Sequence, residues 1–222
     1  MNDQNLKLAY WQKQEANING MLLNPDALEI DERERVQIIG NLPELSGKSI
    51  LELGAGIGRY TSYFASQAKY VNAVDFNQKF IDKNKENNSN FDNTDYQCCN
   101  VMELSFAEAS FDFVFVNWLF MYLEDDEVKE IRDRIHQWLK LDGQLFFRES
   151  CITDSKGNLP LKSTSSKNNL NHSYSHYREP KFYLDLFTAK FKLELQGNIA
   201  IYEQKYNNPN QLFYLFRKKG VL

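Results

Sequence analysis

The clearest sign of a ligand-binding site in this sequence is a set of three glycines at alternate positions, Gly54, Gly56 and Gly58. They follow a short apolar run, 49–53, and precede an amphipathic segment, which is the pattern of a strand, a loop and a helix. Glycines let the backbone approach a ligand closely, and the N–H groups at the start of a helix can donate to that ligand. The pattern therefore predicts a nucleotide-binding loop.

The spacing of the glycines, together with two acidic residues, indicates which class of nucleotide the loop binds. A dinucleotide loop reads G-x-G-x-x-G and cradles a pyrophosphate, whereas these glycines are evenly spaced and Glu52 precedes them within the strand. This variant resembles motif I of methyltransferases that use S-adenosylmethionine (SAM). A second apolar run ends in Asp75, roughly 20 residues further on, where α/β nucleotide folds place the acid that binds the ribose hydroxyls. A tight β-α connection and a helix-capping role for Asp75 are the structural alternatives.

Composition and charge exclude several classes of protein. The 222 residues suffice for one α/β domain, and 42% hydrophobic with 14% aromatic residues indicate a folded core. A net charge of −4 gives no basic field for nucleic acid, and no segment has the length and apolarity of a membrane span or signal peptide. Three cysteines without C-x-x-C spacing suggest neither disulfides nor a zinc site. We therefore expect a cytoplasmic enzyme without nucleic-acid, membrane or metal partners, and its oligomeric state stays open.

Apolar periodicity predicts an alternation of strands and helices, which is typical of a doubly wound parallel sheet. Residues 1–46 are expected to form one or two helices that cap the fold at its N-terminus. Residues 191–203 and 211–217 alternate apolar and polar side chains and predict a closing antiparallel hairpin. The other strands are expected at 49–53, 70–75, 94–98, 111–116 and 143–149, and helices near 57, near 77, at 125–140 and at 180–187.

A polar stretch rich in Ser, Lys and Asn follows the strand that ends at Ser150. Ligands of parallel sheets bind beyond the carboxyl ends of the strands, and long loops in compact domains are often functional. We therefore predict a substrate lid over residues 153–179, with a simple spacer as the alternative.

Six segments spread over nearly the whole chain carry a more specific signal: Tyr10-Trp11, Met21-Leu22, Leu51–Arg59, Asn117–Leu123, Phe146–Cys151 and His176–Pro180. At these segments the chain resembles the phosphoethanolamine N-methyltransferase family. The resemblance implies an α/β, Rossmann-like class I methyltransferase fold, with a mostly parallel seven-stranded sheet, an antiparallel C-terminal hairpin and an N-terminal helical cap, in a single domain, 1–222. It also implies SAM-dependent methylation of phosphoethanolamine towards phosphocholine.

The resemblance implies a set of contacts to SAM. The glycine loop meets the methionine end, the acid after the second strand meets the ribose, and the fourth strand ends near the sulfonium. Asn100 lies where many relatives carry Asp, and its carbonyl is expected to accept from the adenine amino group. The full set is Glu52, Gly54, Ala55, Gly56, Arg59, Asp75, Phe76, Asn100, Val101 and Asn117.

The amine nucleophile of such a substrate needs assistance at neutral pH. An aminoethyl phosphate has an amine pKa of about 10 and is mostly protonated. Tyr10 and Tyr122 are the predicted catalytic residues, because a phenol can relay a proton and an aromatic face tolerates an ammonium. One branch of the family uses a Tyr–His pair, and Tyr122 lies where that branch has His, which leaves the pairing open. His136 lies within a helical pattern that favours a packing or surface role.

A phosphate dianion requires cations and hydroxyl groups around it. Tyr177 and Arg178, at the end of the predicted lid, offer a donor and a planar guanidinium fork. Lys218 matches a basic position in the family, and Tyr202 is a further candidate with a core position as its alternative. Arg148 is another candidate for the phosphate, with a buried structural ion pair to Glu149 as the alternative.

Two other functions stay open on the sequence alone. One is SAM-dependent methylation of another small amine or acid, which would share every motif I residue. The other is a non-catalytic SAM-binding domain, since chains of this family often join two such domains. The number of methyl groups added depends on the room around the nitrogen, which the sequence does not reveal.

Overall fold

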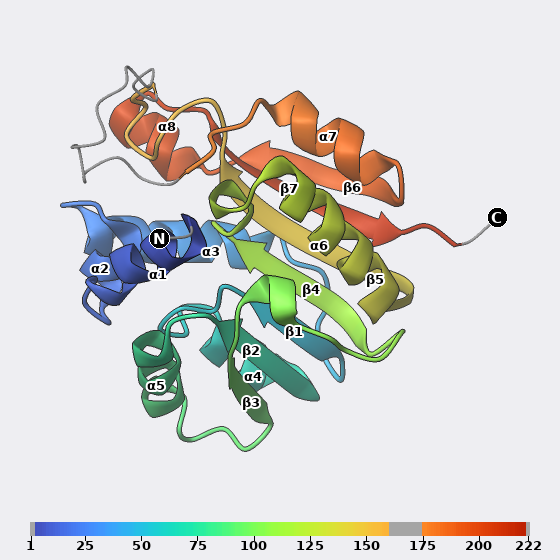
Figure 1. The fold of residues 1–222 in the computed structure, drawn as a ribbon. Coiled ribbons are helices and arrows are strands. Elements are labelled where there is room, and N and C mark those ends of the chain that lie inside the picture. The colour runs from blue at the N-terminus through green and yellow to red at the C-terminus, as the bar shows by residue number, and fades with distance from the viewer. Residues whose placement is uncertain (1–2, 160–174, 221–222) are drawn as a thin grey trace.

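A computed structural model describes residues 3–159 and 175–220, which form a seven-stranded sheet with helices on both faces (Figure 1). The predicted lid, 153–179, therefore falls largely on residues 160–174, which lie outside the described part of the chain. The strands are β1 (Ser49–Leu53), β2 (Tyr70–Asp75), β3 (Thr94–Cys98), β4 (Phe111–Asn117), β5 (Leu139–Ser150), β6 (Phe191–Asn198) and β7 (Gln211–Lys218).

The strands lie in the order β3-β2-β1-β4-β5-β7-β6. The pairs among β1 to β5 are parallel, whereas β7 runs antiparallel to both β5 and β6. β1 and β4 are almost entirely buried, as strands covered on both faces must be. The predicted seven-stranded, mostly parallel sheet with an antiparallel C-terminal hairpin is therefore confirmed.

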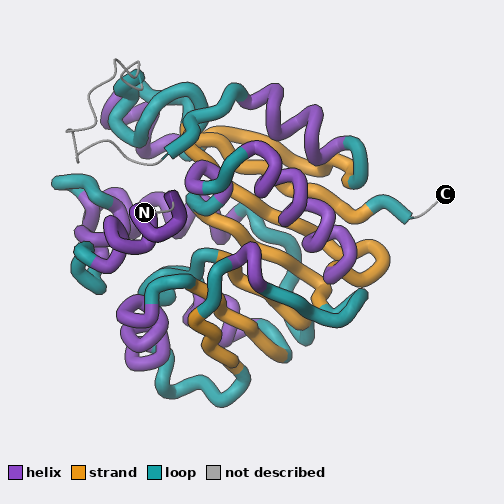
Figure 2. Tube along the Cα trace, viewed as in Figure 1, coloured by secondary structure: helices purple, strands orange, loops and turns teal. Residues whose placement is uncertain are grey.

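Helices cover the sheet in two layers, each with its own apolar core (Figure 2). On one face α3, α4 and α8 pack through Ile38, Phe64 and Tyr202, and on the other α6 and α7 pack through Ile131 and Phe187. The helices are α1 (Asp3–Gln12), α2 (Ile18–Leu22), α3 (Ala27–Gly40), α4 (Thr61–Gln67), α5 (Gln78–Asn87), α6 (Asp125–Trp138), α7 (Pro180–Thr188) and α8 (Ala200–Tyr206), with the short 3-10 helices η1 (Val101–Glu103) and η2 (Phe120–Tyr122).

The hairpin differs from the prediction in its connection. The strand predicted at 191–203 ends at Asn198, and the helix α8 follows it. Tyr202 and Tyr206 lie one helical turn apart, and both pack in the core beneath α3. Asn207 then ends the helix in the left-handed conformation, with φ of 50°. Packing against α3, a contact distant in sequence, selects helix over strand here.

The N-terminal residues form three helices where one or two were expected. α3 packs on one face of the sheet, whereas α1 and α2 contribute Trp11 and Met21 to a pocket at the carboxyl ends of β1 and β2. Across the described ranges, no helix has both the length and the apolar character that crossing a membrane requires.

Candidate active site

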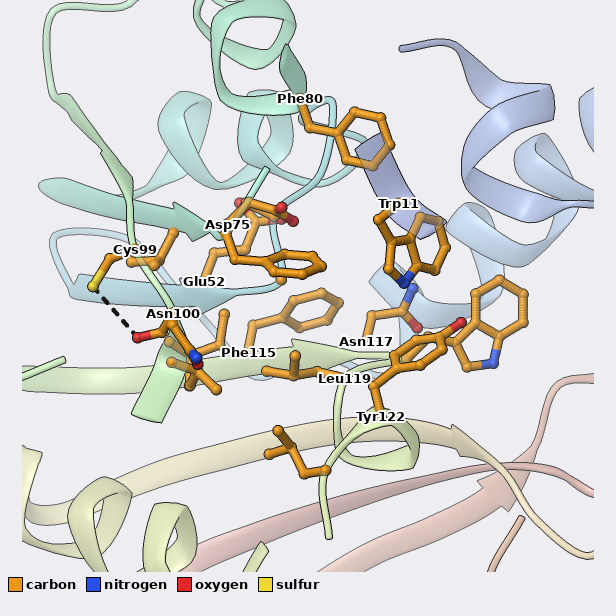
Figure 3. Close-up of a pocket in the computed structure, with 18 of the residues that line it drawn as sticks. Trp11, Glu52, Asp75, Phe80, Cys99, Asn100, Phe115, Asn117, Leu119 and Tyr122 are labelled. Carbon is orange, nitrogen blue, oxygen red and sulfur yellow. Dashed lines mark hydrogen bonds between the residues drawn. The ribbon is translucent and has the colours of Figure 1, made fainter. Parts of the chain in front are cut away.

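A pocket lies between the N-terminal helices and the carboxyl ends of β1, β2 and β4 (Figure 3). Its walls come from the glycine loop, α1, α2, η1 and η2. This is the edge of a parallel sheet at which ligands bind. Nine of the ten predicted cofactor residues line it: Glu52, Gly54, Ala55, Arg59, Asp75, Phe76, Asn100, Val101 and Asn117.

The tenth predicted residue, Gly56, lies in the loop beside the pocket. Its φ is 54°, and a Cβ built on it would lie 2.3 Å from Met21 Cε of α2. At Gly58, where φ is 87°, a Cβ would lie 2.3 Å from Asn84 Oδ1. Both positions therefore need glycine, because the backbone is left-handed and a neighbouring side chain occupies the space.

Asp75 fastens this loop to the end of β2. Its Oδ2 accepts from the N–H of Gly56 at 3.0 Å, and its Oδ1 accepts from the N–H of Asn77 at 2.9 Å. The cap of α5 is Asn77, whose side chain accepts from Lys79, so capping is not the role of Asp75. Burial raises the pKa of Asp75 to about 6, although the backbone hydrogen bonds oppose the shift.

Glu52 is held by a chain of polar side chains below the pocket. Thr61 Oγ1 donates to Glu52 Oε2 at 2.6 Å and accepts from Asn84 Nδ2 at 3.0 Å. Burial raises the pKa of Glu52 to about 8. Asn84 is fully buried, although it begins a polar, Asn-rich stretch, 84–93, whose composition is typical of a surface turn. Its role follows from contacts with α4, which local composition does not encode.

Asn100 caps η1 in addition to lining the pocket. Its Oδ1 accepts from the N–H of Met102 at 3.0 Å. A carbonyl oxygen has two lone pairs. The cap uses one of them, which leaves one for the hydrogen bond expected from the adenine amino group.

Tyr122 lines the pocket together with Trp11, whereas Tyr10 packs against Trp11 just outside the lining; these three side chains are called the aromatic corner below. The ring of Trp11 lies 5.6 Å from that of Tyr10 and 5.4 Å from that of Tyr122, edge to face in both cases. Burial raises the pKa of Tyr10, and Tyr177 adds to the shift. Burial is also the largest cause that raises the pKa of Tyr122, and the nearby Tyr177 and Tyr10 raise it further. Tyr10 and Tyr122 are thus neutral at pH 7, and Tyr177 lies near both.

Arg178, predicted to bind phosphate, is almost fully buried and holds backbone groups. Its Nη1 donates to the carbonyl of Phe120 at 2.8 Å, and its Nη2 donates to the carbonyl of Leu123. Its Nε donates to Asp125 Oδ1 at 2.7 Å. Each of the three nitrogens of the fork donates to a protein acceptor, which places Arg178 against η2, and Arg178 does not line the pocket.

Tyr202 belongs to a buried network centred on Glu34 of α3. Glu34 Oε2 accepts from the Tyr202 hydroxyl and from Arg148 Nη2, the latter at 3.0 Å. Its Oε1 accepts from Arg59 Nη2 at 2.9 Å and from the Tyr60 hydroxyl at 3.2 Å. Burial opposes ionisation of Glu34, but the two arginines hold its pKa below the usual value. Tyr202 is therefore a core residue, which is the alternative that the sequence left open.

Lys218 lies at the wrong end of the sheet for a ligand of this pocket. Its Nζ donates to the carbonyl of Leu139, the first residue of β5, at 2.7 Å. β7 runs antiparallel to β5, so the end of β7 lies at the amino ends of the parallel strands. His136 lies at the same end, where its ring packs 5.3 Å from Phe191, in agreement with the predicted packing role.

Two basic side chains that the sequence did not single out, Lys7 and His176, lie near the aromatic corner. Lys7 lines the pocket, and its Nζ lies 3.3 Å from Glu124 Oε1. The same oxygen lies 3.1 Å from His176 Nε2. Lys7 precedes Tyr10 by one helical turn and His176 directly precedes Tyr177, so proximity to predicted residues was the available signal.

Comparisons with known proteins agree with this geometry. A family model described as a methyltransferase domain matches residues 51–147. A phosphoethanolamine N-methyltransferase of Triticum aestivum is 36% identical over 94% of this chain and 42% of its own length. Phosphoethanolamine N-methyltransferase 1 of Caenorhabditis elegans is 34% identical over 95% of this chain and 46% of its own length. The chain thus spans about half the length of the curated relatives that it matches.

Solved structures give the same assignment. The structure of Haemonchus contortus phosphoethanolamine N-methyltransferase 1, in complex with phosphoethanolamine and S-adenosylhomocysteine, matches with a TM-score of 0.88 and 32% identity. The match covers 99% of this chain and 49% of that one. N-methyltransferase NodS of Bradyrhizobium japonicum, at 16% identity and a TM-score of 0.66 over 88% of this chain, shares the fold. The chain therefore has the class I methyltransferase fold, and over nearly its whole length it is similar to about half of a phosphoethanolamine N-methyltransferase.

Proposed function

We propose that this chain methylates the amine of phosphoethanolamine with SAM, and that residues 1–222 act as one methyltransferase domain. One observation carries the proposal: a single pocket joins the glycine loop and Asp75 to Trp11 and Tyr122, and the ring of Trp11 also packs against Tyr10. The Haemonchus contortus enzyme that binds phosphoethanolamine and S-adenosylhomocysteine matches nearly the whole chain, which supports the same pair of ligands here.

The residues of the pocket fit SAM. Asn117 Oδ1, at the end of β4, is buried and has no hydrogen-bond partner within the described residues, so it is an acceptor available to a ligand. Asp75 offers a carboxylate at the position where ribose hydroxyls bind in this class of fold. When bound, SAM supplies an electrophilic methyl group on a positively charged sulfur. The ten predicted cofactor residues remain our proposed contacts.

The aromatic corner receives the amine. Because Tyr10 and Tyr122 are neutral at pH 7, neither can act as a phenolate base. Their hydroxyl oxygens can instead accept hydrogen bonds from the ammonium and relay its proton away. The ring of Trp11 between them offers an apolar wall that excludes water and a π face that tolerates the cation.

We infer that the phosphate binds at the side of the aromatic corner where Lys7 and His176 lie. Both side chains share one oxygen of Glu124, which is about half exposed. A phosphate dianion carries more charge than one carboxylate and offers more acceptor oxygens, so it can replace Glu124 as their partner. Tyr177 adds a hydroxyl near Tyr10 and Tyr122. The predicted lid, 153–179, remains part of this proposal.

Transfer of an isotope-labelled methyl group from SAM tests the function. We expect labelled product with phosphoethanolamine, and chromatography of the product counts the methyl groups added. Label in a different amine or acid alone would favour the broader methyltransferase function. Binding of SAM without transfer to any of the amines would favour a non-catalytic domain. The cytoplasmic location and the absence of nucleic-acid and membrane partners, inferred from composition, stay predictions.

A further inference from the structure

A buried carboxylate holds the first N–H groups of η2, the short helix that follows β4. Glu149 Oε1 accepts from Leu119 at 3.0 Å and from Phe120 at 2.7 Å. Its Oε2 accepts from Met121 at 3.1 Å. Glu149 lies on β5, beside β4, and is fully buried. N–H groups at the start of a helix have no partner within it, so this carboxylate supplies the missing acceptors.

Arg178 holds the other end of the same segment. Its guanidinium donates to the carbonyls of Phe120 and Leu123, as described above. The chain around Arg178 adds backbone contacts, since the N–H of His176 donates to the carbonyl of Met121 at 2.7 Å. A buried carboxyl group thus takes the backbone donors of η2, and a buried guanidinium takes its acceptors.

The segment held in this way carries two walls of the pocket. Leu119 and Tyr122 both line it, as Figure 3 shows. Leu119 faces the glycine loop, because a Cβ built on Gly54 would lie 3.6 Å from Leu119 Cβ. Tyr122 contacts Trp11 of α1. The position of η2 therefore sets the separation between the cofactor loop and the aromatic corner.

We propose that Glu149 and Arg178 are positioning residues that clamp η2 and thereby place Tyr122 against the reacting amine. Neither residue lines the pocket, so both act through the backbone that they hold. The inference rests on the proposed function, because the position of Tyr122 matters to the rate only if the amine reacts beside it. Displacing a reacting group by about 1 Å can reduce a rate about 100-fold.

Two conservative variants weaken the clamp from its two ends. Glu149→Gln keeps the shape of the side chain and one acceptor oxygen, but its NH2 group faces the N–H of Met121. Arg178→Lys keeps the charge, but a single ammonium cannot span the two carbonyls and Asp125. Arg132→Lys is the matched control, because Arg132 also donates to a carbonyl, that of Leu186, and to Asp133, away from the pocket.

Steady-state kinetics and near-ultraviolet circular dichroism of the folded variants give the readouts. We expect both clamp variants to lower kcat with phosphoethanolamine by about 10- to 100-fold, while the control keeps the wild-type value. Because both residues act on one segment, the double variant should lose less than the product of the two single losses. The dichroism of the Trp11–Tyr122 contact should change in the clamp variants and not in the control.

Wild-type kcat and unchanged dichroism in the two clamp variants would overturn the inference, and either variant suffices if the other does not fold. Failure of the proposed function is a separate result, because it appears as a wild-type protein that transfers no methyl group to phosphoethanolamine. In that case the dichroism still decides whether Glu149 and Arg178 place Tyr122.

Discussion

Burial sets the charges of the acidic residues at the pocket. It raises the pKa of Asp75 to about 6 and that of Glu52 to about 8. At pH 7 Asp75 is therefore mostly a carboxylate, whereas Glu52 is mostly protonated. Of these two acids, only Asp75 offers the ribose hydroxyls a charged acceptor at neutral pH.

The affinity for S-adenosylhomocysteine should fall as the pH falls through about 6, because Asp75 gains a proton and loses charged acceptor strength. Above that pH the carboxylate is ionised and the affinity should be constant. Calorimetric titration between pH 5 and 8 measures this. Asp75→Asn should bind more weakly and with no step near pH 6. Glu52→Gln, which removes the other titrating acid nearby, should keep the step; loss of the step there would assign it to Glu52.

Removing the hydroxyls of Tyr10 and Tyr122 should slow methyl transfer. Each Tyr→Phe change keeps the aromatic wall but deletes the proton relay, and general acid–base assistance is typically worth about 100- to 10,000-fold. Higher pH should partly restore the rate by supplying free amine. The measurement is the pH–rate profile of the single and double variants. Near-normal turnover of the double variant at neutral pH would mean that the tyrosines only form walls.

Lys7→Met should raise the KM for phosphoethanolamine without changing the affinity for S-adenosylhomocysteine. Losing a charge-assisted, partly desolvated contact costs about 1.5–3 kcal/mol, which corresponds to roughly 10- to 150-fold in affinity. Lys13→Met removes an exposed lysine just beyond the same helix and should leave the KM unchanged. Ethanolamine, which lacks the phosphate, gives the control. If Lys7→Met raises the KM for phosphoethanolamine but not that for ethanolamine, Lys7 contacts the phosphate.

The residues predicted to contact the cofactor nearly all line the pocket, whereas Arg178 and Lys218, predicted to bind the phosphate, do not. Motif I and Asp75 are local patterns that follow single strands, so their spacing places them at one edge of the sheet. Arg178 and Lys218 were chosen for their charge, but what a cation binds depends on the backbone that surrounds it. Arg178 donates to carbonyl groups of Phe120 and Leu123, and these contacts join residues more than 50 positions apart.

At the scale of elements, α3 is attached to the sheet by charge as well as by apolar packing. Glu34 accepts from arginines of the glycine loop and of β5, Arg59 and Arg148, with none of its own side chain exposed. Both arginines are themselves buried. Removing one member of such a group leaves an uncompensated buried charge, which costs far more than an exposed ion pair contributes.

Glu34→Gln should therefore lower the free energy of unfolding by about 3–5 kcal/mol. Glu29→Gln is the control on the same helix, because Glu29 is half exposed where it pairs with Arg33 and Lys205, and its loss should be barely measurable. Urea denaturation followed by circular dichroism gives both values. Equal stabilities of the two variants would show that the network does not attach α3.

Most strands were predictable because they carry an apolar run or an apolar–polar alternation of their own, and the connections were less predictable. α8 has an apolar alternation that suits a strand as well as a helix, and its packing against α3 decides the outcome. Lys218 illustrates the same limit, since its place depends on the antiparallel direction of β7. Contacts between distant segments determine both.

At the scale of the whole molecule, the sheet brings cofactor and substrate groups to one edge. The glycine loop and Asp75 come from the first two strands, whereas η2 follows β4, and α1 and α2 close the pocket from the N-terminal side. We therefore expect an enzyme that is selective for an amine with an attached phosphate, because the proposed site of the amine lies beside Lys7 and His176.

The ratio of kcat/KM for phosphoethanolamine to that for ethanolamine tests this account most directly. Both amines present the same nucleophile, so the ratio isolates the contribution of the phosphate. We predict a ratio of at least about 10 to 150, the range expected for one lost charge-assisted contact. Equal values for the two amines, or transfer to ethanolamine alone, would contradict the proposal that this pocket binds the phosphorylated amine.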